Sequence, residues 1–167
     1  MIDPSVLRIL ETTPDVLGAL LGGAPDAALT APEDEGWSVR HVVAHVLDVE
    51  TVIYTDRIQR MLREDGPFIR SIDPLARMNE RGLLGRDVAS LVRDLATGRP
   101  AAVAALRALT AEQLQRGGEH DEAGPITVSD LVHQWAYHDL MHLKQAASIL
   151  QAPLVAGMGN TRKFYDL

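Results

Sequence analysis

The chain has 167 residues, no cysteine and a formal net charge of −7 at pH 7. These values exclude disulfides, thiolate metal ligands and a cysteine nucleophile, and a net negative charge disfavours a nucleic-acid backbone as partner. No apolar run approaches the about 20 residues that span a membrane, and the N-terminus lacks a basic leader. We therefore expect one cytoplasmic domain over residues 1–167.

The first two predicted elements are amphipathic helices. One covers residues 4–21, with Asp3 as its N-cap and Pro14 as the point of a kink. The other covers residues 38–64, begins at the N-cap Ser38 and has a wide apolar face. Helices with one apolar side must bury that side against other elements, which favours a helical bundle.

A long connection separates the second predicted helix from the third. Residues 67–84 have no clear period, and we expect them to be irregular apart from one short turn opened by Asp73. The third helix is expected at residues 86–109, with a short extra turn after Thr110. A connection of this length can cross the whole bundle, so the third helix can run parallel to the second.

The last predicted helix covers residues 128–151. Thr127 and Asp130 have the spacing of a capping box at its start. The residues before it, 117–125, are expected to form a loop containing His120, and the C-terminal tail has no clear period.

These elements predict an all-α fold, a four-helix bundle with one long crossover between helices two and three. If helices two and four pack antiparallel, His45 and His142 lie at nearly equal depths in the bundle. Packed helices have axes about 8–10 Å apart, which leaves room for one ion between the two side chains.

Two histidine pairs have the spacing of one helical turn, His41 with His45 and His138 with His142. A pair on one helix and a third imidazole from a facing helix can form a three-histidine metal site. Spacing alone leaves His41 and His45 both open, whereas the matching depth favours His45. Solvent-facing histidines on amphipathic helices remain the alternative, and a zincin-like site is disfavoured because the tail offers no His or Glu ligand.

Three stretches resemble the DinB-like superfamily of metal-binding four-helix proteins, over roughly residues 36 to 150. The first is GWSVRHVVAHVLDVE (36–50), the second LQRGGEHDEAGPITVSDLV (114–132) and the third HDLMHLKQ (138–145). The third matches the family's His-Asp-x-x-His-x-x-Gln pattern.

The resemblance implies a metal ion bound by His45, His138 and His142, with zinc or nickel as the usual ion and a homodimer as the frequent assembly. Characterised relatives include thiol transferases that use bacillithiol or mycothiol, and a mycothiol-dependent maleylpyruvate isomerase. The expected partners are therefore a small-molecule thiol and an electrophilic substrate, without nucleic acid or membrane.

Several polar residues near these histidines are candidates for supporting roles. Asp48 and Asp139 could each accept an imidazole N–H, and Glu50 and Gln145 belong to the same surroundings. The alternative for each carboxylate is a solvated charge or an ion pair within a helix. His41, in the first helical turn, is expected at the mouth of the site or on the surface.

Other residues have weaker signals, and no catalytic residue is assigned. We expect the tryptophans to be packing anchors and the methionines to fill the core. His120 is a candidate for the mouth of the metal site, and His133 is expected to be packed or exposed rather than a metal ligand. Three arginines are candidates for binding a substrate carboxylate, namely Arg40, Arg57 and Arg162.

Three hypotheses for the function follow. The first is a metal-dependent thiol S-transferase, whose thiol comes from a co-substrate because the chain has no cysteine. The second is a metal-dependent hydrolase, which needs a base such as Asp48, Asp139, His41 or Glu50. The third is a non-catalytic, stress-related metal-binding module with a closed four-ligand site.

Overall fold

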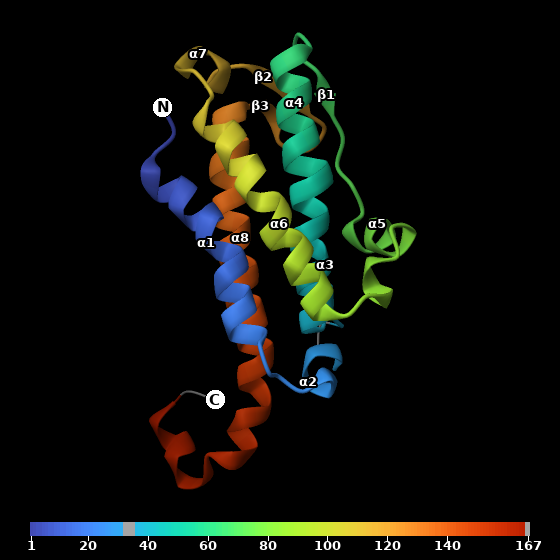
Figure 1. The fold of residues 1–167 in the computed structure, drawn as a ribbon, viewed down its shortest axis with the longest axis vertical. Coiled ribbons are helices and arrows are strands. Elements are labelled where there is room, and N and C mark those ends of the chain that lie inside the picture. Colours follow the sequence, from blue (N-terminus) through green and yellow to red (C-terminus); the bar gives the residue numbers. More distant parts are fainter. Residues whose placement is uncertain (32–35, 166–167) are drawn as a thin grey trace.

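The computed structural model describes residues 1–31 and 36–165. Four helical segments form a bundle, namely α1 (Pro4–Leu21), α3 (Val39–Asp48) continued by α4 (Thr55–Arg63), α6 (Val88–Arg107) and α8 (Val128–Gln151). α1 packs mainly against α6 and α8, and α3 packs against the same two helices. Figure 1 shows α1 and α8 running in one direction and α3, α4 and α6 in the other. The predicted four-helix bundle and the antiparallel second and fourth helices are confirmed.

The connection from α4 to α6 is the predicted crossover. In Figure 1 it descends outside α4, so α6 starts at the end of the bundle where α3 starts and runs parallel to it. The connection is more regular than expected, since it contains β1 (Phe68–Ile69), α5 (Pro74–Glu80) and a 3₁₀ turn, η2 (Leu83–Gly85). Asp73 begins α5 by accepting hydrogen bonds from two backbone N–H groups of its first turn.

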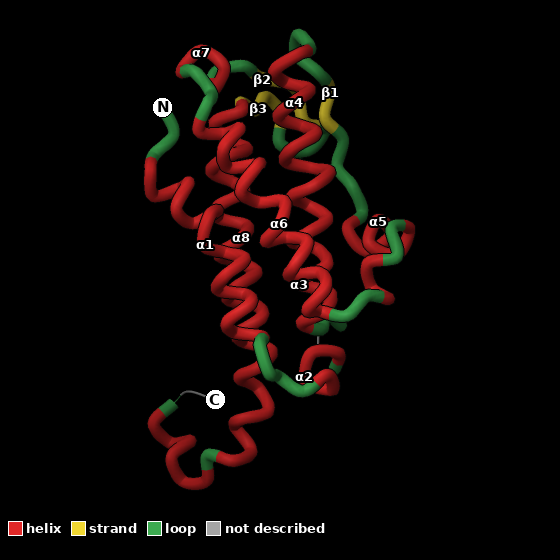
Figure 2. Tube along the Cα trace, in the orientation of Figure 1, coloured by secondary structure: helices red, strands yellow, loops and turns green. Residues whose placement is uncertain are grey.

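The prediction of a loop at residues 117–125 is wrong, because this segment forms a β-hairpin of β2 (Gly117–His120) and β3 (Gly124–Thr127). β2 also pairs in parallel with β1, and Figure 2 shows these strands together at one end of the bundle. Strands of two to four residues are too short to display an alternating pattern. At Gly118 the backbone of β2 comes close to the segment before β1, since a Cβ there would lie 2.6 Å from the carbonyl oxygen of Pro67.

The second predicted helix is interrupted by a π-helical segment, η1 (Val49–Tyr54), between α3 and α4. The hydroxyl of Thr55 donates to the carbonyl oxygen of Glu50 at 2.9 Å, five residues earlier, in keeping with the wider turn. A π-helical turn rotates all following side chains relative to those of α3. Such turns occur frequently at functional sites.

A buried polar layer divides the core of the bundle into two apolar clusters. On α6, Arg99 lies between Leu95 of one cluster and Val103 of the other, and a similar division occurs on α1, on α8 and between α3 and the π-helical segment. The members of this layer are buried Thr13, His45, Asp48, Glu50, Arg99, Asp139 and His142. Since polar groups are buried only at a cost, a layer of this size at mid-bundle indicates a role beyond packing.

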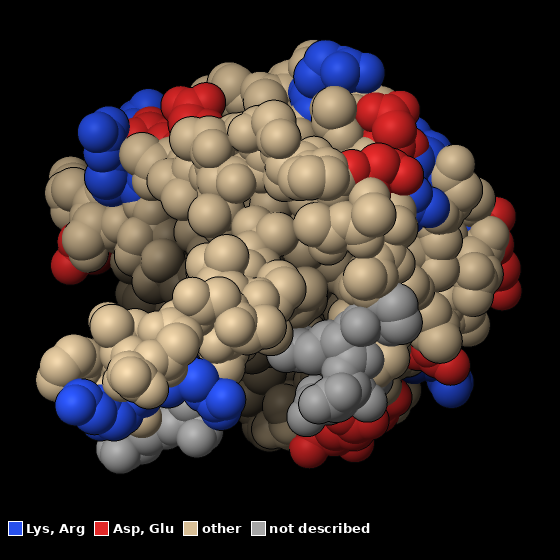
Figure 3. Space-filling model, turned by 90° about the horizontal axis from the view of Figure 1, so that it is seen from below, with Lys and Arg blue, Asp and Glu red and all other residues tan. Residues whose placement is uncertain are grey.

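The remaining elements lie outside the bundle core. α2 (Asp26–Thr30) follows α1, and α7 (Ala111–Leu114) precedes the hairpin. After α8 the chain forms two 3₁₀ segments without buried residues, η3 (Ala152–Gly157) and η4 (Gly159–Phe164), which stand away from the bundle in Figure 1. On the face seen in Figure 3, charged groups of both signs are scattered around an uncharged middle. Among the described helices, none is both long and apolar enough to cross a membrane.

Candidate metal centre

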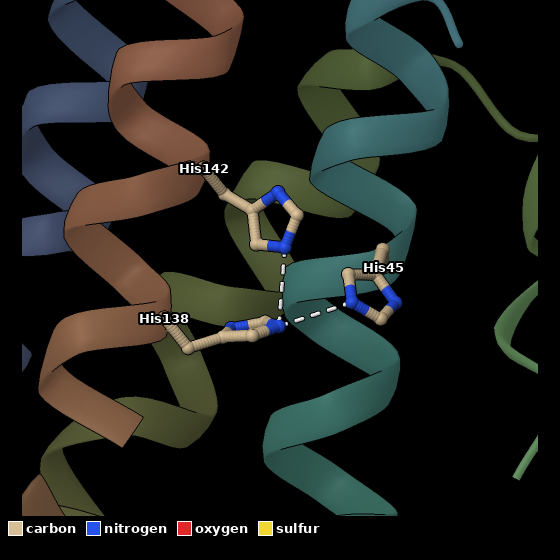
Figure 4. Close-up of side chains that lie close together, drawn as sticks. All are labelled: His45, His138 and His142. Carbon is tan, nitrogen blue, oxygen red and sulfur yellow. Dashed lines mark hydrogen bonds between the residues drawn. The ribbon is translucent and has the colours of Figure 1, made fainter. Parts of the chain in front are cut away.

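The imidazoles of His45, His138 and His142 meet in the polar layer, between α3 and α8. The Nε2 atom of His138 lies 3.0 Å from Nε2 of His45 and 3.1 Å from Nε2 of His142. Figure 4 shows the three rings directed at one another, one from α3 and two from successive turns of α8. One ligand atom from each side chain lies within 4.8 Å of the others, a compact set that can hold a metal ion.

Local sequence explains why these residues meet. α8 begins at Thr127, whose side chain forms a capping box with Asp130 as predicted, so the phase of the helix is set at its first turn. α3 begins in the same way at Ser38, where the partner in the capping box is His41. The hydroxyl of Ser38 lies 2.8 Å from Nδ1 of His41. The His41 side chain therefore caps the helix, and the three-residue cluster does not include it.

All three imidazoles are held in their neutral form. Burial lowers the pKa of His45 to about 4 and that of His138 to about 2, with the neighbouring His142 as the next cause in both cases. Burial also lowers the pKa of His142. A neutral imidazole keeps one nitrogen lone pair for a metal ion.

Gln145 determines which nitrogen of His142 keeps that lone pair. Its Oε1 atom lies 2.8 Å from Nδ1 of His142, and an amide oxygen can only accept, so Nδ1 carries the proton. The lone pair is then on Nε2, which faces the cluster. The expectation that Gln145 belongs to the surroundings of the site is therefore confirmed.

The residues fit a metal ion by a second criterion as well. Nδ1 of His45 and Nδ1 of His138 are buried and form no hydrogen bond with the described residues. Nε2 of His138 lies at hydrogen-bonding distance from Nε2 of both His45 and His142, but one neutral ring nitrogen is either a donor or an acceptor and cannot satisfy two lone pairs and keep its own. Three imidazole ligands with an open position are typical of zinc and suit nickel.

Aromatic rings surround the cluster. The Trp37 ring stacks on His142 with an interplanar angle of 9° and meets His45 edge-on at 5.3 Å between centroids. The Tyr54 ring stacks on Trp135 and lies 6.0 Å from the His138 ring. Trp135 is 1% exposed, as expected of a packing anchor, and Trp37 packs on the imidazoles themselves.

The predictions that Asp48 and Asp139 accept an imidazole N–H are wrong. Asp48 is buried and bound by Arg77, with Nε to Oδ2 at 3.1 Å, and by Arg81. Asp139 and Glu50 are bound by one buried residue, Arg99. Guanidinium groups form stronger, charge-assisted hydrogen bonds with carboxylates than neutral imidazoles do, which explains the outcome.

Arg99 is the polar residue that sequence reasoning missed. It is 1% exposed, donates to Glu50 at 2.8 Å and to the carbonyl oxygen of Leu10 at 2.6 Å, and lies over the Trp135 ring. A signal was present, because Arg99 continues the apolar face of α6 formed by Leu91, Leu95 and Val103. An arginine in such a face predicts buried carboxylate partners.

The weaker candidates lie away from the cluster. His120 is half-buried beside Asp121, at 3.3 Å, and His133 is exposed with its Nδ1 atom 2.8 Å from the carbonyl oxygen of Ser129. Arg40 binds the carbonyl oxygen of Leu84. Arg162 is exposed, and Arg57 lines a separate cavity beside α4.

Fold and site together define a metal-binding protein with a four-helix bundle. Its sequence matches the DinB superfamily over residues 9–146, and the chain belongs to this superfamily.

Two relatives extend the comparison. The Bacillus subtilis protein named "Putative metal-dependent hydrolase YfiT" is 30% identical over 139 residues, which are 82% of this chain and 78% of that protein. The Oceanobacillus iheyensis protein named "Putative metal-dependent hydrolase OB0413" is 27% identical over 150 residues, which are 85% of this chain and 83% of that protein.

Two solved structures resemble the fold. One is the structure of Bacillus subtilis YfiT, described as having an unusual four-helix bundle topology. Its TM-score is 0.81 at 26% identity, and the match covers 91% of this chain and 90% of the YfiT chain. The four-helix bundle protein TT2238 has a TM-score of 0.57 at 25% identity, covering 86% and 97% respectively.

Proposed function

We propose that the protein binds one divalent ion per chain, zinc or nickel, through Nε2 of His45, His138 and His142, and transfers a low-molecular-weight thiol to an electrophile. The single observation that carries this proposal is a cluster of three neutral imidazoles whose neighbouring carboxylates are ion-paired with arginines. When bound, the ion would supply a positive charge that lowers the pKa of a thiol or water ligand.

The carboxylates near the cluster favour a thiol over water as the nucleophile. Among the described residues of the polar layer, Asp48, Glu50 and Asp139 are each ion-paired with an arginine, and only Oδ1 of Asp139 lacks a hydrogen-bond partner, so a carboxylate base would have to act from within an ion pair. A thiol has a pKa of about 8.5 and water one of about 15.7, so a thiol ionises with much less assistance. Trp37 covers His45 and His142 and thereby limits access of competing water.

The second candidate is a metal-dependent hydrolase, which the names of the two relatives favour. The experiment compares transfer of mercaptoethanol to a chlorodinitrobenzene acceptor with hydrolysis of a nitrophenyl ester in the absence of thiol. We expect metal-dependent transfer and little ester hydrolysis. Ester hydrolysis that needs the metal but no thiol would establish the hydrolase instead.

The first prediction concerns the metal itself. His142→Ala should reduce metal content, measured by elemental analysis, from about one ion per chain to near zero because it removes one of three ligands. His133→Ala is the matched control, since His133 is exposed on the same helix and outside the cluster. Equal metal content in wild type and His142→Ala would refute the three-histidine site.

The homodimer implied by the family stays a prediction, to be tested by light scattering.

A further inference from the structure

A cavity of about 360 Å³ lies between α4 and the segment that leads from β1 to α5. Four arginines line it, Arg57, Arg60, Arg70 and Arg77, although the chain as a whole carries a net charge of −7. Phe68 and Ile69 supply apolar surface, and a single carboxylate, Asp56, belongs to the described lining. Cavities of this size accommodate small organic ligands.

Two of the four guanidinium groups have no carboxylate partner. Arg60 pairs with Glu64 at 3.1 Å and Arg77 with Asp48 at 3.1 Å. Arg57 and Arg70 form no ion pair with any residue of the described ranges. Arg57 donates instead to the carbonyl oxygen of Arg70 at 2.7 Å, and the Arg70 guanidinium lies 5.7 Å from the centre of the Phe68 ring.

Arg57 is a half-buried cation in this arrangement. Burial lowers its pKa from the ordinary value, which shows that the charge is incompletely solvated. Asp121 and Asp56 contribute a favourable field, but the carboxylate of Asp121 is bound by the backbone and hydroxyl of Ser71. A ligand carboxylate would accept charge-assisted hydrogen bonds from this half-buried guanidinium.

The cavity is next to the histidine cluster. Tyr54, one turn before Arg57, has its ring 6.0 Å from the His138 ring. Arg77 binds Asp48, one turn after His45 on α3. Two buried side chains, Tyr54 and Asp48, thus connect residues of the cavity wall with the surroundings of the cluster.

We propose that the arginine cavity binds the carboxylate of a co-substrate that reacts at the histidine cluster, with Arg57 and Arg70 as its principal ligands. The inference rests on the proposed function for the identity of that reaction, whereas carboxylate binding itself does not. Planar guanidinium groups recognise carboxylates through paired hydrogen bonds, which fixes the orientation of the bound molecule. The carboxylate can belong to the thiol or to the electrophile.

The first experiment measures binding without turnover. Metal-free protein is titrated calorimetrically with succinate and, separately, with inorganic phosphate. We expect saturable succinate binding that Arg57→Gln weakens by about tenfold or more, since a charge-assisted hydrogen bond is lost. Arg93→Gln, which removes an exposed arginine of α6, should leave the affinity unchanged. Absent succinate binding, equal affinities in wild type and Arg57→Gln, or tighter phosphate binding would each overturn the proposal.

Arg70→Gln guards against a folding defect in Arg57→Gln, because Arg70 is exposed and donates no side-chain hydrogen bond within the described structure. It should weaken succinate binding in the same direction while the thermal unfolding midpoint stays close to that of wild type. Normal succinate affinity in a folded Arg70→Gln protein would remove Arg70 from the site and overturn the two-arginine assignment.

The second experiment identifies the source of the carboxylate in the metal-loaded protein. It compares kcat/KM for mercaptopropionate and mercaptoethanol with a neutral acceptor, then for charged and neutral acceptors with mercaptoethanol. A preference for the carboxylated partner in either series, reduced about tenfold in Arg57→Gln and kept in Arg93→Gln, supports the proposal and names the source. No preference in either series overturns it. Succinate binding without any transfer activity would refute the proposed function and leave the cavity assignment intact.

Discussion

The middle of the bundle contains two groups of three polar side chains, five of them buried and His138 half-buried, that differ in charge and in how they bind one another. In the first group Arg99 bridges Glu50 and Asp139, so a cation faces two anions. In the second, His45, His138 and His142 are neutral and direct three nitrogens at the same point. The charged groups of the first set bind one another as ion pairs, whereas the neutral rings of the second have lone pairs to share with a ligand.

This difference separates a structural group from a ligand-binding one. The arginine group links α1, η1, α6 and α8 through the carbonyl oxygen of Leu10, Glu50, Arg99 and Asp139. Removal of Arg99 leaves two buried carboxylates without their cation. The histidine group needs an external ion to satisfy its nitrogens, so its loss should affect binding more than folding.

Arg99→Met should have the largest effect on stability. It leaves Glu50 and Asp139 buried without their cation, and the breaking of such a group costs about 3–5 kcal/mol. Urea unfolding of the metal-free protein at pH 7 measures this free energy. Because well-packed apolar replacements of buried ion pairs are often tolerated, the triple variant Glu50→Leu/Arg99→Met/Asp139→Leu should recover most of the loss.

The matched change in the histidine group is His138→Leu. In the metal-free protein it should alter the free energy of unfolding by about 1 kcal/mol or less, since it replaces a buried imidazole whose Nδ1 atom lacks a partner among the described residues. The same variant should bind no metal. A loss of stability as large as that of Arg99→Met would remove the distinction between the two groups.

Acid should destabilise the metal-free protein through the histidine group. The pKa of His45 is about 4 in the folded chain against an ordinary value of 6.5. Above pH 6.5 the imidazole is neutral in both states, but as the pH falls towards 4 the unfolded chain binds a proton that the folded chain does not. From pH 8 to pH 5 this linkage costs about 2 kcal/mol for His45 alone.

Urea unfolding at both pH values checks this prediction, with His45→Leu as the control that should lose less stability. The arginine group responds to acid in the opposite sense, because burial raises the pKa of Glu50 and of Asp139 and the folded chain takes up those protons more readily. Identical pH dependence in wild type and His45→Leu would contradict the assignment of neutral imidazoles.

Gln145→Leu should affect metal binding rather than folding, because it removes the acceptor that fixes the proton of His142 on Nδ1. Metal affinity should fall by about 10- to 100-fold, the usual effect of losing such a hydrogen-bond partner. Competition with a chromogenic chelator measures it. Gln145→Glu keeps an acceptor at this position and should retain metal affinity, so a loss in both variants would argue against the tautomer explanation.

Much of the fold was predictable because it depends on local signals. Helical periodicity and capping residues such as Asp3, Ser38 and Thr127 located the four long helical segments. The length of the 67–84 connection implied the crossover. The hairpin and the π-helical turn were missed because a strand of four residues and one added residue in a helical turn leave almost no periodic signal.

The sequence by itself determined the helices, the equal depth of His45 and His142, and hence which three histidines can meet. Only the tertiary structure decided the partners of the acidic residues, assigning Asp48 to Arg77 and Arg81 and both Glu50 and Asp139 to Arg99. It likewise brought Arg57 and Arg70 to one cavity. The physical reason is that helix phase is set by neighbours in the chain, whereas the partner of a long charged side chain depends on which distant segment packs beside it.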